Sequence, residues 1–223
     1  MFREILQEFN GRNVCNTSQL YPYCSVLEIL LNYCKEVQET RRLNEGSTKD
    51  TTGHMNVTAV GGNNAGLNAR AAKFARSTLV ELIGRPHLDV FHQERLIPLN
   101  INFNIKLILS QNDILCNSAA PAQGAQQENY NLIIKSANLI IRTKMLTSRT
   151  HKALIDRLLS QNMVHHFSRI QMKHLSIPAN QTSINFDNVF TMALPNLVIV
   201  CLVSDDDLAG CYQSNPLITK ILT

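Results

Sequence analysis

The sequence predicts a mainly β protein with two short helices. Residues 101–110 alternate apolar and polar side chains, interrupted only at Ile108, and this period of two is typical of a strand with one buried and one exposed face. Residues 131–145 and 197–203 are rich in branched aliphatic side chains, which favour strands. Helical spacing of apolar residues, by contrast, stands out in only two segments.

Further strands are expected around these three. The segment 131–145 carries a polar Ser-Ala-Asn interruption, which predicts a bent or bulged strand. The continuous apolar run 197–203 fits a strand that is buried on both faces. Shorter or less regular patterns predict strands at 78–83, 87–91 and 167–177.

The two helices are expected at residues 25–37 and 148–162. In the first, apolar residues follow helical spacing, and Ser25 with Glu28 matches the S-x-x-E capping box, which satisfies free amide groups at a helix start. The second carries an apolar stripe over about three turns, with Ser148 or Thr150 as its cap.

Two long segments, residues 41–68 and 117–128, lack periodicity and are rich in small and polar residues. We therefore expect long loops, which on a β scaffold are functional, exposed or mobile. The glycine-rich stretch 61–70 lacks the Lys-Ser/Thr pair of a phosphate-binding loop. We interpret it as a mobile loop.

Composition excludes several classes of protein. The chain has 223 residues, 44% of them hydrophobic and 17% charged, and its net charge of +4 is spread thinly along the sequence. Without a Lys/Arg-rich block, we expect no specific nucleic-acid partner and no membrane anchor. The longest apolar run, 197–203, is far shorter than the roughly 20 residues of a membrane span. The six cysteines form no CxxC pair, which favours free thiols in a reducing, intracellular compartment over secretion.

One segment offers ligand-type side chains for a metal. His87, Asp89 and His92 lie within six residues. If this segment is a strand, His87 and Asp89 project together while His92 starts on the opposite face. The spacing matches neither HExxH nor a zinc finger, so we favour a structural pairing of His87 and Asp89. A metal-dependent enzyme that uses these three residues and His54 stays open as an alternative.

No other motif points to catalysis. No serine occupies a GxSxG elbow, and no cysteine lies in a recognisable nucleophile context. The prediction from the residues is therefore a protein that is not an enzyme, with no catalytic residue, no cofactor and no bound metal.

Several segments, taken in order, resemble one family, the double jelly-roll major capsid protein, or hexon, of Polinton/Maverick elements and adintovirus-like viruses. The similarity covers almost the whole chain, and LIGRPHLDVFHQE is its most specific part. The matching segments are FNGRNV (9–14), YPYCSVLEILLNY (21–33), DTTGHMN (50–56), ELIGRPHLDVFHQERLIPLN (81–100), NLIIKSANLIIRTKM (131–145), SRIQMKHLSIPAN (168–180), FDNVFTMALPNLVIVCLV (186–203) and SNP (214–216).

The resemblance implies a jelly-roll β-sandwich, here an incomplete double jelly roll. Residues 1–145 would form a first jelly roll without its opening strands, 146–163 a connecting helix, and 164–223 the opening strands of a second. Family members assemble as trimers that tile a shell, so the implied partners are copies of the chain and other capsid proteins. The implied location is a virion, or the cell interior if no particle forms.

The resemblance also implies a shortened or decayed copy of a mobile element, because only the middle of the family pattern is present. Cys34 and His92 stand where the family commonly has Gly and Asn. The competing interpretation is a domesticated interaction module, in which an exposed strand edge adds a partner's peptide to the sheet.

Overall fold

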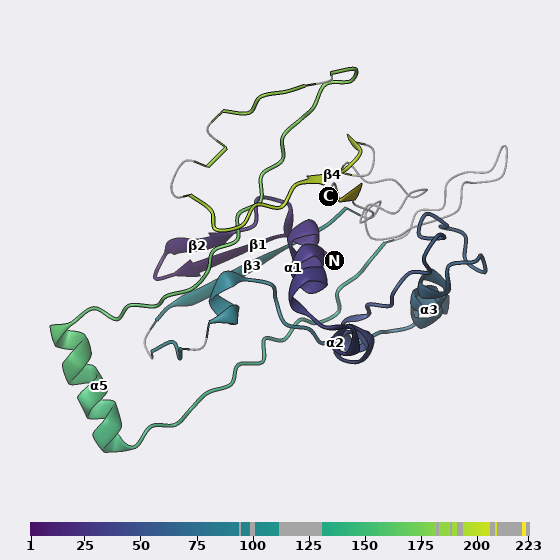
Figure 1. Ribbon diagram of the computed structural model, residues 1–223. Coiled ribbons are helices and arrows are strands. Elements are labelled where there is room, and N and C mark those ends of the chain that lie inside the picture. The colour runs from purple at the N-terminus through teal and green to yellow at the C-terminus, as the bar shows by residue number, and fades with distance from the viewer. Residues whose placement is uncertain are drawn as a thin grey trace.

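The computed structural model describes residues 1–93, 95–98, 101–111, 131–181, 183–187, 189–190, 194–205, 208 and 220–221. In this part of the chain the fold is mixed α/β, built from a small antiparallel sheet of three strands and a few helices (Figure 1). The predicted fold class is therefore confirmed only in part, since strands and helices are present but the described residues form neither a mainly β protein nor a jelly roll. None of the helices in these ranges is long and apolar enough to cross a membrane.

The sheet has β1 (Phe2–Phe9) in the middle, between β2 (Arg12–Asn16) and β3 (Phe103–Leu109), and both pairings are antiparallel. β3 confirms the strand predicted at 101–110. Asn10 and Gly11 join β1 to β2 with φ angles of 49° and 76°. Two left-handed residues make the two-residue hairpin turn whose twist matches that of the flanking strands. The hairpin was not predicted.

The hydrophobic core lies on one face of this sheet. Its buried members are Ile5, Cys15, Tyr21 and Leu88, and the half-buried Phe2, Phe91 and Ile105 pack against them. These residues come from all three strands, from the first helix and from the segment before β3. Packing in this core therefore holds the first helix and the segment before β3 against the sheet.

The predicted helix at 25–37 is two helices. α1 (Tyr21–Asn32) begins four residues earlier than expected, with Pro22 in its first turn, where the missing amide hydrogen does no harm. It ends at Tyr33, whose backbone is extended, and α2 (Lys35–Thr40) follows. The capping box is wrong, because Ser25 lies inside the helix and its hydroxyl donates to the carbonyl of Pro22 at 2.8 Å.

The predicted loop at 41–68 contains ordered structure. A 3-10 turn, η1 (Arg41–Glu45), follows α2, and α3 (Ala65–Phe74) begins inside the glycine-rich stretch, continuing into η2 (Ala75–Ser77). The side chain of Asn64 caps α3 by accepting hydrogen bonds from the amides of Leu67 and Thr51. The interpretation of 61–70 as a mobile loop is therefore corrected for residues 65–70, which belong to a helix that Asn64 caps.

The strands predicted at 78–83 and 87–91 are also wrong. Residues 78–88 form no β-ladder with any described strand, and Asp89–His92 form a 3-10 turn, η3. Leu88 and Val90 are buried in this segment. The apolar pattern at 87–91 therefore arises because these residues are buried against the sheet, and not because they pair as a strand.

Within the described residues, the second half of the chain has little strand pairing. Residues 131–147 and 161–181 run as long connections that form no β-ladder within the described ranges, and only Cys201–Leu202 (β4) of the predicted strand at 197–203 pairs, with Lys220–Ile221 (β5). The predicted helix at 148–162 is confirmed as α5 (Ser148–Ser160), with Thr147 as its cap in place of Ser148 or Thr150. It lies at the other end of the molecule from α3 (Figure 1). The predicted loop at 117–128 lies outside the described residues.

Candidate functional site

Three ligand-type side chains meet between α1 and η3. One carboxylate oxygen of Glu28 lies 2.8 Å from Nδ1 of His87, and its other oxygen lies 3.1 Å from Nε2 of His92. Each of the three residues offers a ligand atom within 4.8 Å of the other two. This group, Glu28 with His87 and His92, is called the His-Glu-His cluster below.

The local fold explains why these residues meet. Glu28 lies on the buried face of α1, two turns after Tyr21, so its side chain faces the segment that crosses the helix. His87 precedes η3 and His92 is its last residue. The turn brings the two imidazoles onto one side with ring centroids 5.9 Å apart and nearly parallel. A straight strand would have placed them on opposite faces.

The cluster is largely shielded from solvent. The exposed fractions of the side chains are 7% for Glu28, 8% for His87 and 27% for His92. Burial by itself would raise the pKa of the Glu28 carboxyl, but the hydrogen bond from His87 and the charges of His87, His92 and Arg85 outweigh burial and hold that pKa below its ordinary value. Glu28 is therefore a carboxylate at neutral pH, able to accept from both rings.

Burial acts in the opposite direction on the partly exposed imidazole. It lowers the pKa of His92, and the nearby charges of Arg85 and His87 add to this effect, while Glu28 opposes it. At neutral pH His92 is therefore a neutral imidazole. A neutral ring has one nitrogen with a free lone pair, which is the form that a metal ion binds.

Two tyrosines fix the position of His87. The hydroxyl of Tyr21 accepts a hydrogen bond of 3.0 Å from the backbone amide of His87. Tyr33 meets the imidazole edge-on, with ring centroids 6.4 Å apart. Both tyrosines belong to α1 or its C-terminal cap, so the helix that supplies Glu28 also holds the histidine that faces it.

Asp89 is not part of this cluster, and the predicted pairing of His87 with Asp89 is wrong. Its carboxylate accepts a hydrogen bond from the backbone amide of Ile170 at 3.3 Å, and it lines a small hollow with Cys15 and Arg169. Burial raises the pKa of Asp89. The physical reason for the separation is that no strand forms at 87–91: His87 precedes η3 and Asp89 is its first residue, so the alternation that would place both on one face is absent.

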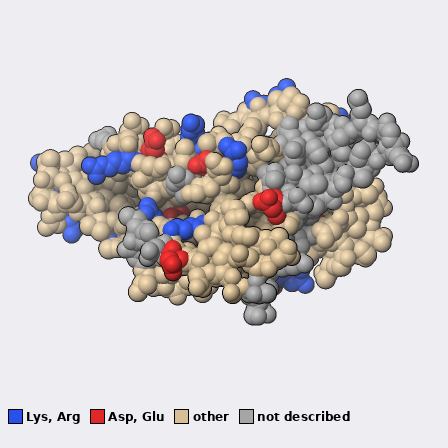
Figure 2. Space-filling view, turned by 90° about the horizontal axis from the view of Figure 1, so that it is seen from above, with Lys and Arg blue, Asp and Glu red and all other residues tan. Residues whose placement is uncertain are grey.

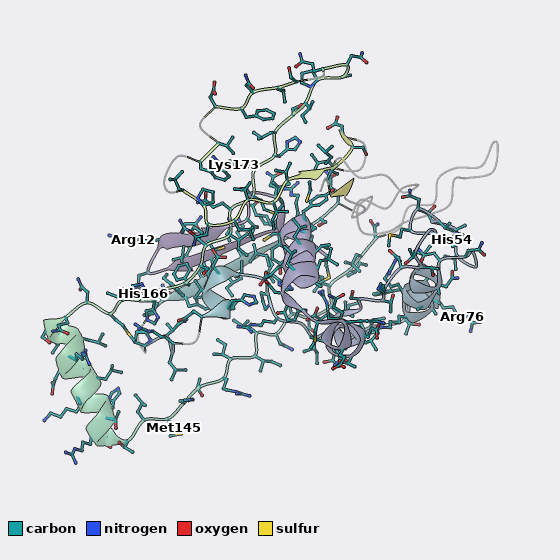
Figure 3. All side chains as sticks on the ribbon, in the orientation of Figure 1. Arg12, His54, Arg76, Met145, His166 and Lys173 are labelled. Atoms are coloured by element: carbon teal, nitrogen blue, oxygen red, sulfur yellow. The ribbon has the colours of Figure 1, made fainter. Side chains whose placement is uncertain are left out.

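His54 also lies elsewhere. Figure 3 places it beside α3, away from α1. Its backbone belongs to turns, since its amide donates to Thr51 and its carbonyl accepts from Val57. Of the four residues proposed from the sequence, the structure thus brings together His87 and His92 and leaves out His54 and Asp89. The carboxylate that completes the set belongs to Glu28, for which the sequence pattern predicts a capping role instead.

The chemistry open to the cluster follows from its atoms. In its present geometry Nδ1 of His87 is hydrogen-bonded to one carboxylate oxygen of Glu28, and Nε2 of His92 lies 3.1 Å from the other oxygen at ion-pair distance. The same atoms, two imidazole nitrogens and a carboxylate oxygen, form a ligand set that zinc accepts in proteins. Comparisons of this chain with protein-family models, with curated proteins and with solved structures found no match.

Proposed function

We propose that this chain is a structural subunit of the capsid type, which associates with copies of itself through apolar segments of its second half. The observation that supports this is the exposure of large aliphatic side chains in segments whose sequences predict strands. Examples are Met145 at 100%, Ile140 at 84% and Leu197 at 75%. Figure 3 shows Met145 on the outlying connection before α5.

The exposed apolar side chains form sets rather than single positions. In residues 131–147 they are Ile133, Ile134, Leu139, Ile140, Ile141, Met145 and Leu146, in α5 they are Ile155, Leu158 and Leu159, and in residues 194–202 they are Leu194, Leu197, Val198, Ile199, Val200 and Leu202. Burying one such side chain stabilises a protein by about 1.5–3 kcal/mol. Exposed apolar patches are typical of interaction sites, and we infer that these side chains form one.

The surface charge is compatible with contact between identical chains. Figure 2 shows one face on which Lys, Arg, Asp and Glu are scattered singly among a larger area of other residues. A net charge of +4 over 223 residues opposes self-association only weakly. The burial of apolar side chains therefore outweighs charge repulsion when two copies meet.

The resemblance to the double jelly-roll capsid proteins supplies the form of the assembly. In that arrangement residues 131–145 and 197–203 are strands of β-sandwiches, buried on pairing with further strands. A strand without a partner presents free amide and carbonyl groups that a second chain can satisfy. We infer that pairing between copies completes the ladders that one chain alone leaves open.

The test is the mass of the purified full chain, measured by sedimentation velocity over a range of concentrations. We expect trimers or larger species, and Ile140→Lys reduces them because it places a charge in the apolar contact. The control is Asn56→Lys, which adds the same charge at a polar, exposed position outside the proposed apolar contact. A chain that stays monomeric at all concentrations contradicts the proposal and favours an interaction module that needs a different partner.

A further inference from the structure

We propose that Glu28, His87 and His92 bind one divalent transition-metal ion of the zinc type, and that this ion fastens α1 to η3. The inference rests on the His-Glu-His cluster alone and is independent of the proposed capsid function. It assigns the ion a structural position between two elements that are far apart in the sequence.

The geometry of the cluster is close to that of a metal site. Zinc binds imidazole nitrogen and carboxylate oxygen at about 2.0–2.2 Å, and a tetrahedral arrangement then separates neighbouring ligand atoms by about 3.3 Å. The distances from the Glu28 oxygens to the two imidazole nitrogens are 2.8 and 3.1 Å. All three ligand atoms lie within 4.8 Å of one another. These separations differ from the tetrahedral value by no more than about 1.5 Å, and we infer that side-chain rotations bring the three ligand atoms around one ion.

The ligand set selects the class of metal. Two imidazoles and one carboxylate suit zinc, cobalt, nickel and copper, whereas magnesium and calcium prefer oxygen ligands throughout. The more exposed side of the cluster is His92, whose side chain is 27% accessible. A water molecule can therefore occupy a fourth position from the solvent side.

The proton balance of binding is simple. At present Nδ1 of His87 is hydrogen-bonded to one carboxylate oxygen of Glu28, and Nε2 of His92 lies 3.1 Å from the other oxygen. When an ion binds at these nitrogens, a hydrogen that either of them carries moves to the other nitrogen of the same ring or to solvent. Glu28 is already a carboxylate, so it releases no proton, and no redox step is involved.

Because of the position of the cluster, a bound ion stabilises the folded chain. Glu28 belongs to α1, and the two histidines belong to the segment 87–92, which also places Leu88 and Phe91 in the core of the sheet. An ion that joins them binds the folded chain and not the unfolded one. It therefore shifts the folding equilibrium by mass action.

The first measurement is the metal content of the full chain after chelator treatment, incubation with Zn²⁺ and gel filtration. We expect about one zinc ion per chain and no retention of Mg²⁺ or Ca²⁺ under the same conditions. Co²⁺ in place of Zn²⁺ gives a visible absorption band of tetrahedral or five-coordinate cobalt. A folded wild-type chain that retains no zinc and gives no such band overturns the proposal.

The second measurement uses variants. His92→Ala removes the ligand that is least buried, and Glu28→Gln keeps the size of the side chain while removing its charge. Both abolish stoichiometric zinc and the increase in melting temperature that zinc causes in the wild type. His54→Ala and His166→Ala, at exposed histidines outside the cluster, keep both. Zinc content that is unchanged in His92→Ala, or that falls equally in His54→Ala, overturns the assignment.

Discussion

The hydroxyl of Tyr21 lies 3.0 Å from the backbone nitrogen of His87 and accepts its hydrogen bond across 66 residues of sequence. Tyr21 is itself buried in the core, and burial raises the pKa of its hydroxyl to about 12. The hydroxyl is therefore uncharged at neutral pH. This one contact joins the start of α1 to the segment that carries both histidines of the cluster.

Removing that hydroxyl leaves a part-buried amide without its acceptor. We expect Tyr21→Phe to lower the free energy of unfolding by about 1–2 kcal/mol, because the ring still fills its place while the His87 amide loses its partner. Urea denaturation followed by circular dichroism measures the loss. The control is Tyr33→Phe, which changes the other tyrosine beside His87 and should have a smaller effect. Equal losses in the two variants would contradict the assignment.

Gly66 lies where the first turn of α3 touches the preceding chain. A Cβ added there would lie 2.3 Å from the carbonyl oxygen of Lys49, and a backbone atom cannot yield as a side chain can. We expect Gly66→Ala to destabilise the protein by about 1–3 kcal/mol, although alanine is the better helix former. In Gly84→Ala the nearest atom belongs to the flexible side chain of Glu45, at 3.0 Å. Thermal melts should show a clear loss only for Gly66→Ala.

The side chain of Asn64 caps the start of the same helix, α3. Asn64 is 1% exposed, and its side-chain oxygen accepts from the amides of Leu67 and Thr51. We expect Asn64→Ala to cost about 1–2 kcal/mol, the usual value of a lost N-cap. The neighbouring Asn63 is exposed, and Asn63→Ala serves as the control in the same chemical denaturation series. A loss for Asn63→Ala as large as that for Asn64→Ala would place the cap at the wrong residue.

The elements that sequence reasoning predicts correctly are those with a local signal. The alternation at 101–110 indicates β3, and the apolar stripe at 148–162 indicates α5. The hairpin of β1 and β2 also has a local signal, the Asn10-Gly11 pair, which is typical of a two-residue turn. Charged residues interrupt the apolar–polar alternation of β1. Without that alternation, the Asn-Gly pair alone does not predict a hairpin. Asn64 before α3 is a second such signal, typical of an N-cap.

The cluster could not be predicted, because its assembly depends on the fold. Glu28 and His87 are 59 residues apart, and no periodicity links a helix to a distant turn. The prediction for His87, Asp89 and His92 assumes a strand, and the 3-10 turn reverses which of them share a face. Similarly, an apolar run such as 131–145 predicts burial but does not indicate which segment covers it. Within the described residues, no strand pairs with that segment.

Two thiols, one inside α1 and one just after it, differ in environment and should differ in reactivity. Cys34 is exposed at the break between α1 and α2, whereas burial raises the pKa of Cys24 to about 12, with smaller contributions from Glu28 and Asp89. The thiolate is the nucleophile, so at pH 8 only about one Cys24 in ten thousand is in the reactive form.

We therefore expect iodoacetamide at pH 8 to modify Cys34 long before Cys24, as measured by mass spectrometry of the digested protein. The labelling rate of Cys24 should rise about tenfold for each pH unit while the protein stays folded, because its thiolate fraction is far from saturation. Cys34→Ser is the control, since it removes the fast reaction and leaves the slow one. Labelling of Cys24 at the rate of Cys34 in folded protein would show that α1 does not shield this thiol and would also contradict the burial of Glu28 one turn further along the same helix.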